Sequence, residues 1–304
     1  MDQLQSMRVF TKVVETGSFI AASEAMGISR PMASKHVARL EHTLGVKLLT
    51  RTTRTVSMTE AGRSFYGRCL NIFASIDEAV QEAGNLRVQP KGQLRVSAPH
   101  SFGHKHLARS IAGFMQAFPD IEVDLTLNDR VIDLVDEGFD LAIRIGHLSD
   151  SSLIARKLAT CYLKVCASPS YIEAHGMPQT PDDLLEHNCL YYCYLVEGTR
   201  WKFRKDGQDY TVKTSGRFQA NSGDAITEAA VQGLGVLLEP TFITGPHLAS
   251  GALVPLLSDY EIAPRGIYAV YPQNRLLPQK VRVFIDYLAK QYGQTPYWDD
   301  WEVK

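Results

Sequence analysis

The chain has 304 residues, 45% of them hydrophobic, and its formal net charge is −1. This length gives room for two or three domains with sizeable cores. No apolar run approaches the roughly 20 residues that a membrane helix needs, so we expect no membrane-spanning segment.

The charge is unevenly distributed along the chain. Residues 1–68 carry ten Lys and Arg against five Asp and Glu, a balance of +5, whereas the remainder has 22 against 28, a balance of −6. A basic N-terminal module on an acidic body indicates that the first segment alone meets a polyanion. Because +5 is modest for one module, useful affinity favours at least two copies.

The start of the chain and its cysteines bear on the compartment. The sequence MDQLQSMRVF lacks the charged and apolar regions of a signal peptide. Five cysteines form no CxxC pair, and an odd number favours reduced thiols in a cytoplasmic protein. A redox switch that pairs Cys161 with Cys166, or Cys189 with Cys193, is the alternative interpretation, although cysteine is also a common buried apolar residue.

Three helices are expected at the N-terminus. Apolar residues at helical spacing predict the first helix over residues 2–16. The next stretch, SFIAASEAMGISRPMASKHVARLE, predicts two helices around a tight turn. Ser18 can cap the first of these, Gly27 can end it with a positive φ, and Ser29 can cap the second, with Pro31 in its first turn. One buried stripe of the second helix is expected to contain Ala33, Val37, Leu40 and Leu44.

The opposite side of that second helix has the character of a DNA-reading surface. Short polar and basic side chains gather at its N-terminal end, where a recognition helix places its base-reading residues. These side chains are Ser29, Arg30, Pro31, Ser34 and Lys35. An amphipathic helical hairpin with a merely solvated polar face is the alternative for the helices alone.

The segment GVKLLTRTTRTVSMTEAG, residues 45–62, predicts a two-stranded wing. Bare cations on a hairpin beside a recognition helix suit phosphate contact and minor-groove insertion, and here they are Lys47, Arg51 and Arg54. Its apolar positions, expected to seat the wing on the domain, are Val46, Leu48, Leu49, Val56 and Met58.

A long helix is expected to follow the wing. Thr59 can cap it, and it should run to about Leu86. Its residues repeat at heptad spacing along Gly62, Tyr66, Cys69, Phe73, Ile76, Val80 and Ala83. The position of this seam between two domains favours self-association, which would set two recognition helices at a fixed spacing. The alternative is one amphipathic helix packed on its own domain.

From Gln93 onwards short strands alternate with helices, which predicts an α/β fold with open, parallel-rich sheets flanked by helices. The predicted strands are QLRVSA, IEVDLTL, FDLAIRI and YLKVCAS, and the predicted helices cover 103–118, 130–137, 169–175, 223–233 and 278–291. Ligands in such sheets collect where strands lead into helix N-termini. Two junctions qualify, around Ser97–Gly103 and Asn221–Asp224, and both favour a carboxylate or similar anion. Ordinary helix capping by Ser101 and Ser222 is the alternative.

The chain resembles the LysR-type transcriptional regulators over nearly its whole length. The matching segments are VFTKVVETGSF, AAS, ISRPMASKHVARLE, LGVKLLTRTTRTVSMTEAG and AVQGLGVLLEP. It is most similar to the branch with an RTTR wing and an SFG pocket element. Two residues depart from the pattern: Arg30 stands where many members carry Gln, and Glu239 stands where an apolar residue or Gln is common.

The resemblance implies an organisation in four parts. A winged helix-turn-helix DNA-binding domain would cover 1–58, a dimerising linker helix 59–88, a hinge 89–92 and an effector-binding domain 93–304. The last part would resemble periplasmic binding proteins, with one subdomain formed by 93–161 and 267–304 and the other by 162–266.

The resemblance also implies a function. The protein would bind double-stranded DNA sequence-specifically, without a cofactor, and respond to a small-molecule effector, an organic acid, in the cleft between the subdomains. It would form a homodimer through the linker helix and a homotetramer through its C-terminal domains. The implied effector-binding residues are Ser97, His100, Ser101, Phe102, Asn128, Arg144, Gly146, Tyr194, Trp201, Asn221 and Ser222. Arg144 could instead pair with Asp140 or another carboxylate, and the aromatic residues could equally belong to a core or to a dimer surface.

Two other classes of function find little support in the sequence. A metal sensor could use His100, His104 and His106, yet His104 and His106 point to different faces of the predicted helix and no zinc-like ligand set is completed. An enzyme is disfavoured because no GxSxG, HExxH, P-loop or GxGxxG motif occurs. We therefore expect neither a metal site nor catalysis.

Overall fold

The computed structural model describes residues 2–51, 56–83, 90–146, 153–195, 198–273, 277–293 and 296–299. The chain forms two compact units. Unit 1 consists of Met1–Gln89, Ile132–Asp140 and Asn274–Gln279. Unit 2 consists of Pro90–Val131, Leu141–Gln273 and Lys280–Lys304. Within the described ranges, no helix has the length and apolar character that a membrane crossing requires.

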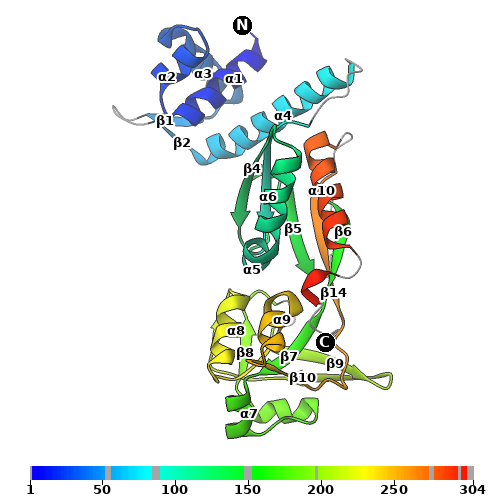
Figure 1. The fold of residues 1–304 in the computed structure, drawn as a ribbon. Coiled ribbons are helices and arrows are strands. Elements are labelled where there is room, and N and C mark those ends of the chain that lie inside the picture. Colours follow the sequence, from blue (N-terminus) through cyan, green and yellow to red (C-terminus); the bar gives the residue numbers. More distant parts are fainter. Residues whose placement is uncertain are drawn as a thin grey trace. The chain divides into compact units, whose positions relative to one another are not determined.

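Unit 1 contains four helices and a small hairpin among its described residues (Figure 1). They are α1 (Gln3–Thr16), α2 (Phe19–Ala25), α3 (Arg30–Leu44), β1 (Leu49–Arg51), β2 (Val56–Met58) and α4 (Glu60–Ala83). Their core gathers apolar side chains from all three N-terminal helices, from β1 and from α4, including Val13, Ala22, Val37, Leu49 and Cys69.

The predicted caps of α2 and α3 are confirmed. The Ser18 hydroxyl accepts a hydrogen bond from the Ile20 N–H at 3.2 Å, and Gly27 has a φ of +64°. The Ser29 hydroxyl accepts one from the Met32 N–H at 3.4 Å. Ser18 thus fixes the start of α2, whereas Gly27 and Ser29 fix the turn after it and the start of α3.

The expected apolar contacts of α3 and the wing are wrong at two residues. Ala33, Val37 and Leu40 are buried, but Leu44 is 36% exposed and Val46 is exposed as well. Leu44 is the last residue of α3, and the chain turns at Gly45 with a φ of +70°. The chain therefore leaves the core before Leu44 and returns to it at Leu48.

The first half of the heptad seam packs inside unit 1. Thr59 caps α4, because its hydroxyl accepts a hydrogen bond from the Gly62 N–H at 2.9 Å. Cys69 is fully buried in the unit 1 core, and Tyr66 and Phe73 pack against that core. This half of the seam therefore behaves as the alternative interpretation predicted. The side chains of Val80 and Ala83, and Leu86 itself, lie outside the described residues.

Unit 2 is built on two five-stranded sheets. The first has the order β4-β3-β5-β14-β6 and uses β3 (Gly92–Ala98), β4 (Ile121–Leu127), β5 (Leu141–Gly146), β6 (Leu153–Cys161) and β14 (Arg265–Pro272). The second has the order β11-β8-β12-β7-β13 and uses β7 (Leu163–Ala167), β8 (Cys189–Tyr192), β11 (Gln219–Ala220), β12 (Val236–Pro240) and β13 (Val254–Leu256).

The two sheets share one pattern of strand directions. In the first, β3 pairs parallel with β4 and β5, whereas β14 pairs antiparallel with β5 and β6. In the second, β8 pairs parallel with β11 and β12, whereas β7 pairs antiparallel with β12 and β13. The sheets are thus mixed, not parallel-rich as predicted, because the chain passes from β6 to β7 and back into β14, and those strands run against their neighbours.

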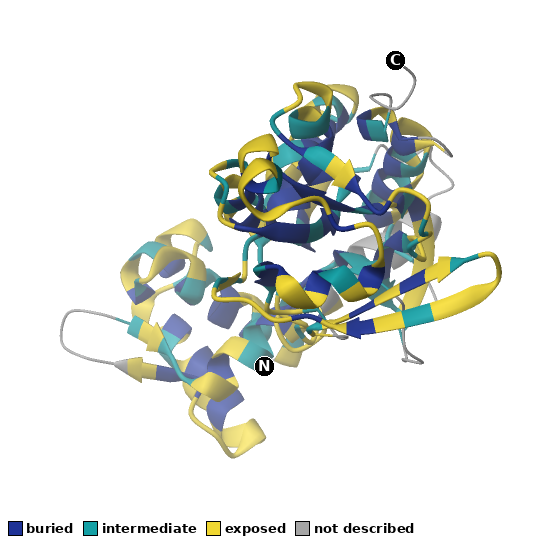
Figure 2. Ribbon diagram, turned by 90° about the horizontal axis from the view of Figure 1, so that it is seen from below, coloured by how far each residue is buried: buried dark blue, intermediate teal, exposed yellow. Residues whose placement is uncertain are grey.

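Helices flank both sheets. The remaining elements are α5 (His100–Phe102), a π-helical turn (Gly103–Leu107), α6 (Ala108–Ala117), α7 (Pro169–His175), a 3₁₀ turn (Pro181–Glu186), the hairpin β9 (Arg200–Lys205) with β10 (Gln208–Lys213), α8 (Gly223–Val231), α9 (Thr241–Ala249) and α10 (Gln279–Tyr292). Helices α6 and α10 lie by the first sheet, and α8 and α9 by the second (Figure 1). Buried residues concentrate in the sheets and on the inner helix faces (Figure 2).

The element boundaries agree with the prediction in some places and differ in others. Strand β4 and helix α7 have the predicted bounds. The predicted helix over 130–137 does not form, because the Asp133 carboxylate accepts hydrogen bonds from the N–H groups of Val135 at 2.9 Å and Asp136 at 3.0 Å. This local side-chain bonding favours a turn over a helix.

Candidate DNA-binding surface and ligand pocket

The predicted base-reading residues share the N-terminal end of α3. Ser29, Arg30, Pro31 and Lys35 are exposed, and Ser34 is half-buried. The opposite face of the helix is buried in the unit 1 core through Ala33, Val37 and Leu40. The exposed face is therefore rigidly held and can present cations and short polar groups to a groove.

A buried carboxylate ties the wing to α3. Glu41 Oε1 accepts hydrogen bonds from the N–H groups of Leu48 at 3.0 Å and Leu49 at 3.1 Å. Glu41 Oε2 lies 2.7 Å from Lys47 Nζ. Burial opposes ionisation of Glu41, but the bonds from Lys47 and from the two N–H groups outweigh it and lower the pKa of this carboxyl.

The prediction of a bare cation at Lys47 is therefore wrong, although its side chain is 76% exposed. Sequence reasoning missed Glu41. The signal was a carboxylate directly after the buried Leu40 and just before the wing. The side chain of Arg51 and the whole of Arg54 lie outside the described residues.

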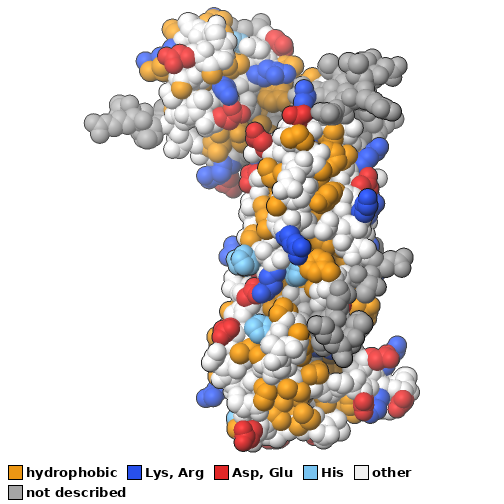
Figure 3. Space-filling model, viewed as in Figure 1, with side chains coloured by type: hydrophobic (Ala, Val, Ile, Leu, Met, Phe, Trp, Pro, Cys, Tyr) orange, Lys and Arg blue, Asp and Glu red, His pale blue; other side chains and the backbone are white. Residues whose placement is uncertain are grey.

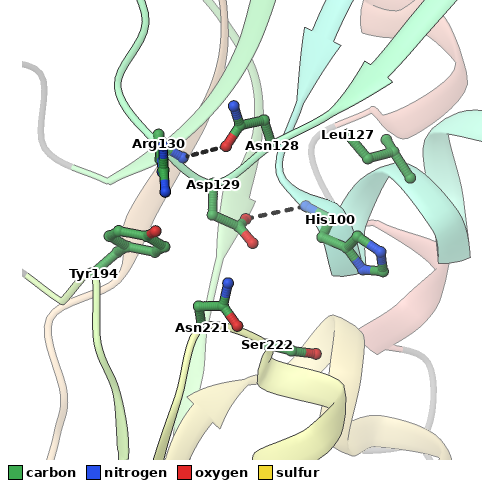
Figure 4. Close-up of a pocket in the computed structure, with 8 residues that line it drawn as sticks. All are labelled: His100, Leu127, Asn128, Asp129, Arg130, Tyr194, Asn221 and Ser222. Atoms are coloured by element: carbon green, nitrogen blue, oxygen red, sulfur yellow. Dashed lines mark hydrogen bonds between the residues drawn. The ribbon is translucent and has the colours of Figure 1, made fainter.

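A cavity of about 440 Å³ lies in unit 2 among residues that adjoin both sheets (Figure 4). His100 starts α5, and Leu127 ends β4. The other lining residues stand in the loops after β4, after β8 and after β11; they are Asn128, Asp129, Arg130, Tyr194, Asn221 and Ser222. Both predicted strand-to-helix junctions thus contribute to one cavity.

Hydrogen bonds hold the polar lining in place. The His100 N–H donates to Asp129 Oδ1 at 3.0 Å, and the Arg130 N–H donates to Asn128 Oδ1 at 2.9 Å. The Tyr192 hydroxyl also bonds the Asp129 side chain; burial first, and then this carboxylate, raise the Tyr192 pKa. The N–H of His100, which the sequence offered to an effector anion, is thus bound to a carboxylate of the protein.

At the second junction, residues 221–224, the carboxylate of Asp224 forms an ion pair. Lys105 Nζ lies 3.0 Å from Asp224 Oδ1, at the start of α8. Burial opposes ionisation of Asp224, but hydrogen bonds from Ser101 and Lys105 and the charge of Lys105 outweigh it, so its pKa is lowered. The Ser222 hydroxyl accepts the Ala225 N–H at 3.3 Å, as the capping alternative proposed.

Several predicted effector residues are not among those that line this cavity. Phe102 packs in an aromatic cluster with Phe242 and Trp298, with ring centroids 5.4 and 5.7 Å away. Trp201 is 2% exposed and belongs to the core under the second sheet. Both side chains pack inward, so of Phe102, Tyr194 and Trp201 only Tyr194 lines this cavity.

The remaining predicted residues do not line the cavity. They are Ser97 and Ser101, both buried, and Arg144 and Gly146 on β5. Sequence reasoning missed Leu127, Asp129 and Arg130. All three lie within two residues of the predicted Asn128, so the signal was the end of β4 itself.

One buried carboxyl adjoins the lining. Glu239 on β12 is 4% exposed, and its Oε1 has no hydrogen-bond partner among the described residues. A Cβ at Gly223 would lie 2.9 Å from its Oε2, so the carboxyl packs on the start of α8. Burial raises the Glu239 pKa to about 8; Arg265 lowers it, and Asp224 and Asp129 raise it further.

The described residues give little support to a metal-binding site or a redox-active cysteine pair. They contain no cluster of three or more His, Cys, Asp or Glu side chains placed to hold a metal ion. His106 is buried, with its ring nitrogens 2.7 Å from the Tyr297 hydroxyl and 3.0 Å from the Phe242 carbonyl. Burial raises the pKa of the thiols of Cys69, Cys161, Cys166 and Cys189 to about 12.

The chain matches two family models. Residues 4–63 match the bacterial regulatory helix-turn-helix protein, lysR family, and residues 87–293 match the LysR substrate binding domain. Among curated proteins, it is 41% identical to an uncharacterized HTH-type transcriptional regulator of Haemophilus influenzae, covering 92% of this chain and 98% of that one. It is 36% identical to the HTH-type transcriptional regulator PtxR of Pseudomonas aeruginosa, covering 97% and 94%.

A solved structure supports the same assignment. The LysR-type transcriptional regulator CrgA from Neisseria meningitidis matches with a TM-score of 0.62 and 33% identity, covering 95% of this chain and 99% of that one.

Proposed function

The chain belongs to the LysR family of bacterial transcriptional regulators, and we propose that its effector is an organic anion bound in the cavity lined by His100, Asp129, Arg130 and Ser222. Like the family, it is a DNA-binding regulator with a helix-turn-helix domain and an effector-binding domain, and it forms oligomers. The cavity carries this proposal, because it combines a guanidinium with polar side chains from loops that adjoin both sheets.

We propose that the exposed end of α3 reads the operator. Arg30 and Lys35 can each bind guanine in the major groove, and Ser29, Pro31 and Ser34 would shape the contact. Arg51 and Arg54 would contact phosphates, and Lys47 would join them while paired with Glu41. These phosphate contacts would set the affinity and its dependence on salt.

We further propose the division into parts and the assembly. The DNA-binding domain covers 1–58, the linker helix 59–88, the hinge 89–92 and the effector domain 93–304, with subdomains 93–161 plus 267–304 and 162–266. The linker helix forms a homodimer, and the effector domains join dimers into tetramers. Since Tyr66, Cys69 and Phe73 pack within unit 1, the dimer contact belongs to the other faces and the later turns of α4.

The effector would act by changing the geometry of the bound DNA. Its anionic group would bind between the loop after β4 and the start of α8, and so favour one arrangement of the two sheets over another. Such a shift requires that the effector bind the two arrangements with different affinity. Two half-sites on one face of the duplex would report the change as a new spacing or bend.

Footprinting tests the proposal directly. The purified protein would be titrated onto the DNA upstream of its own gene at several salt concentrations, with and without a panel of aromatic and aliphatic acids. We expect protection of two half-sites that weakens steeply with salt and shifts with one acid. Protection that no acid alters would contradict the effector proposal alone, and the absence of sequence-preferring protection would contradict the proposed base-reading surface.

A further inference from the structure

Asp129 brings a negative charge to the cavity. Its carboxylate is oriented by the His100 N–H at 3.0 Å and by the Tyr192 hydroxyl, and it is half-buried. No ion pair involves Asp129 in the part of the chain that the structure describes. A carboxylate has about four lone-pair sites, so two of them stay open to a ligand.

Arg130 brings the opposite charge to the same cavity. It is exposed, it lines the cavity, and no ion pair to it is found within the described ranges. Figure 4 shows Asp129 directed to the His100 side of the cavity and Arg130 placed on the Tyr194 side. The two charged groups therefore occupy different sides of the space that a ligand would fill.

The cavity is thus balanced in charge. With histidine counted as neutral, its lining carries one Asp and one Arg, and its other members are uncharged. The nearby Asp224 is already paired with Lys105 at 3.0 Å. A ligand with only negative charge would gain attraction from Arg130 but would meet repulsion from Asp129 in a partly desolvated site.

We propose that the effector is zwitterionic: it carries a protonated amine that binds Asp129 together with a carboxylate that binds Arg130, as an α-amino acid does. This inference rests on the proposed effector cavity and narrows the organic anion to one that also bears an ammonium group. Asn221, Asn128 and Tyr194 offer amide oxygens and a ring face that also suit an ammonium. Asp129 is then the residue that selects for the amine.

Matched ligand sets test the inference on the full-length protein. L-leucine, L-glutamate and L-phenylalanine would each be compared by calorimetry with the acid that lacks the amine and with the amine that lacks the carboxylate. The variants would be Asp129→Asn, Arg130→Gln and, as a control on the exposed β9–β10 hairpin, Asp209→Asn. Thermal midpoints would verify that each variant is folded.

We expect at least one amino acid to bind the wild type about tenfold or more tightly than its deaminated acid, the size of one charge-assisted hydrogen bond. Asp129→Asn should abolish that preference and leave the plain acid bound equally or more tightly. Arg130→Gln should weaken the binding of the amino acid and of the plain acid but not that of the amine. Asp209→Asn should leave the affinity for all three ligands unchanged.

Two results would contradict the inference: one would refute the zwitterionic effector alone, and the other would also refute the proposed organic-anion effector. Plain acids that bind as tightly as amino acids, with a ratio unchanged in Asp129→Asn, would refute the zwitterion and keep the organic-anion effector. Binding of neither amino acids nor plain acids would refute both.

Discussion

At the scale of single residues, Glu41 shows how one carboxylate positions the wing that we propose to contact DNA. It satisfies the N–H groups of Leu48 and Leu49 at the point where the chain enters β1, and it holds Lys47. A buried polar group that serves three donors fixes the wing relative to α3, because losing it would leave those donors without partners.

Replacing this carboxylate should loosen the wing. In Glu41→Gln one acceptor oxygen and the charge are lost, so we expect local stability to fall by about 1–3 kcal/mol. Hydrogen exchange of the Leu48 and Leu49 amides would report the loss, and Glu24→Gln on the exposed face of α2 is the control. Unchanged protection of both amides would contradict this role.

Because the pKa of Glu41 is lowered, the difference in local stability between the wild type and Glu41→Gln should depend on pH. The ionised carboxylate stabilises the fold above the usual carboxyl pKa of 4.5, and that contribution is lost as the pH falls through the lowered folded-state pKa. The gap in protection between wild type and Glu41→Gln should therefore narrow in acid.

The pH dependence of stability that Glu239 contributes is opposite in sign to that of Glu41. Burial raises its pKa from 4.5 to about 8, so the folded state holds a proton that the unfolded chain releases. Stability contributed by the neutral carboxyl is therefore lost as the pH rises from about 4.5 to about 8, and is constant above that range. Ionisation is unfavourable here because Oε1 is buried and has no hydrogen-bond partner within the described ranges of the chain.

A neutral isostere should remove this pH dependence. We expect Glu239→Gln to match the wild type near pH 5 and to be more stable by at least about 1 kcal/mol at pH 8.5. Thermal unfolding followed by tryptophan fluorescence would measure it, since Trp201 is buried in the same unit. Glu173→Gln on α7 is an exposed control, and equal midpoints for wild type and Glu239→Gln across that range would contradict the argument.

At the scale of elements, local signals in the sequence predicted boundaries well where one residue determines them. Ser29 and Pro31 start α3, and Gly45 ends it with a φ of +70°. The same approach failed at 130–137, where Asp133 bonds its own neighbours instead of a helix. Propensity and periodicity do not register that competition.

The residues predicted to bind an effector show a different limit of prediction from sequence. The sequence placed Asn128 and Asn221 at strand ends, and both line the cavity. It also nominated Phe102 and Trp201, which pack in cores instead. Whether an aromatic side chain faces a cavity or a core depends on long-range packing, and no local pattern contains that information. Asp129 directly follows the predicted Asn128, so its place at a strand end was predictable, whereas its bond to His100 was not, because that bond joins residues 29 apart in sequence.

Gly62 sets how closely α4 packs on the wing. A Cβ at this residue would lie 2.0 Å from the carbonyl oxygen of Leu48, which also accepts the Thr59 N–H at 3.0 Å. Alanine normally stabilises a helix interior relative to glycine by about 1 kcal/mol. At Gly62 the clash of a Cβ with the Leu48 backbone should make alanine destabilising instead of stabilising.

We expect Gly62→Ala to destabilise unit 1 by at least about 2 kcal/mol. Far-UV circular dichroism during urea unfolding, with hydrogen exchange of unit 1 amides, would measure the change. Ala61→Gly, at the exposed neighbouring residue, is the control and should cost only about 1 kcal/mol. A Gly62→Ala variant as stable as the wild type would show that the backbone there can move.

At the scale of the whole molecule, the distribution of charge and the course of the chain between the two units can be followed. On the face shown in Figure 3, red and blue side chains are interspersed, in keeping with the near-neutral total. The loop after β4 supplies Asp129 and Arg130 to the cavity, and the same chain continues into Ile132–Asp140, which belongs to unit 1.

That continuing segment contacts α4 within unit 1. Arg68 Nη2 lies 3.1 Å from Asp136 Oδ1, and a Cβ at Gly67 would lie 3.2 Å from the Gly138 Cα. Both members of the ion pair are 58% exposed, so it contributes little to stability. Because the segment that carries Asp136 continues the chain from the proposed effector cavity, we predict that this pair takes part in transmitting effector binding to α4.

Charge swaps at this contact should change the coupling and spare the fold. Because the pair is exposed, Arg68→Asp and Asp136→Arg should each leave the thermal midpoint nearly unchanged, yet both reduce the ratio of operator affinities measured with and without bound effector. The double swap restores opposite charges and should recover most of that ratio. Band-shift titrations give the four ratios, and calorimetry verifies that each variant still binds the effector. If the single swaps keep the wild-type ratio, the signal does not pass through Asp136; if the double swap fails to recover it, the charge pairing is not what transmits it.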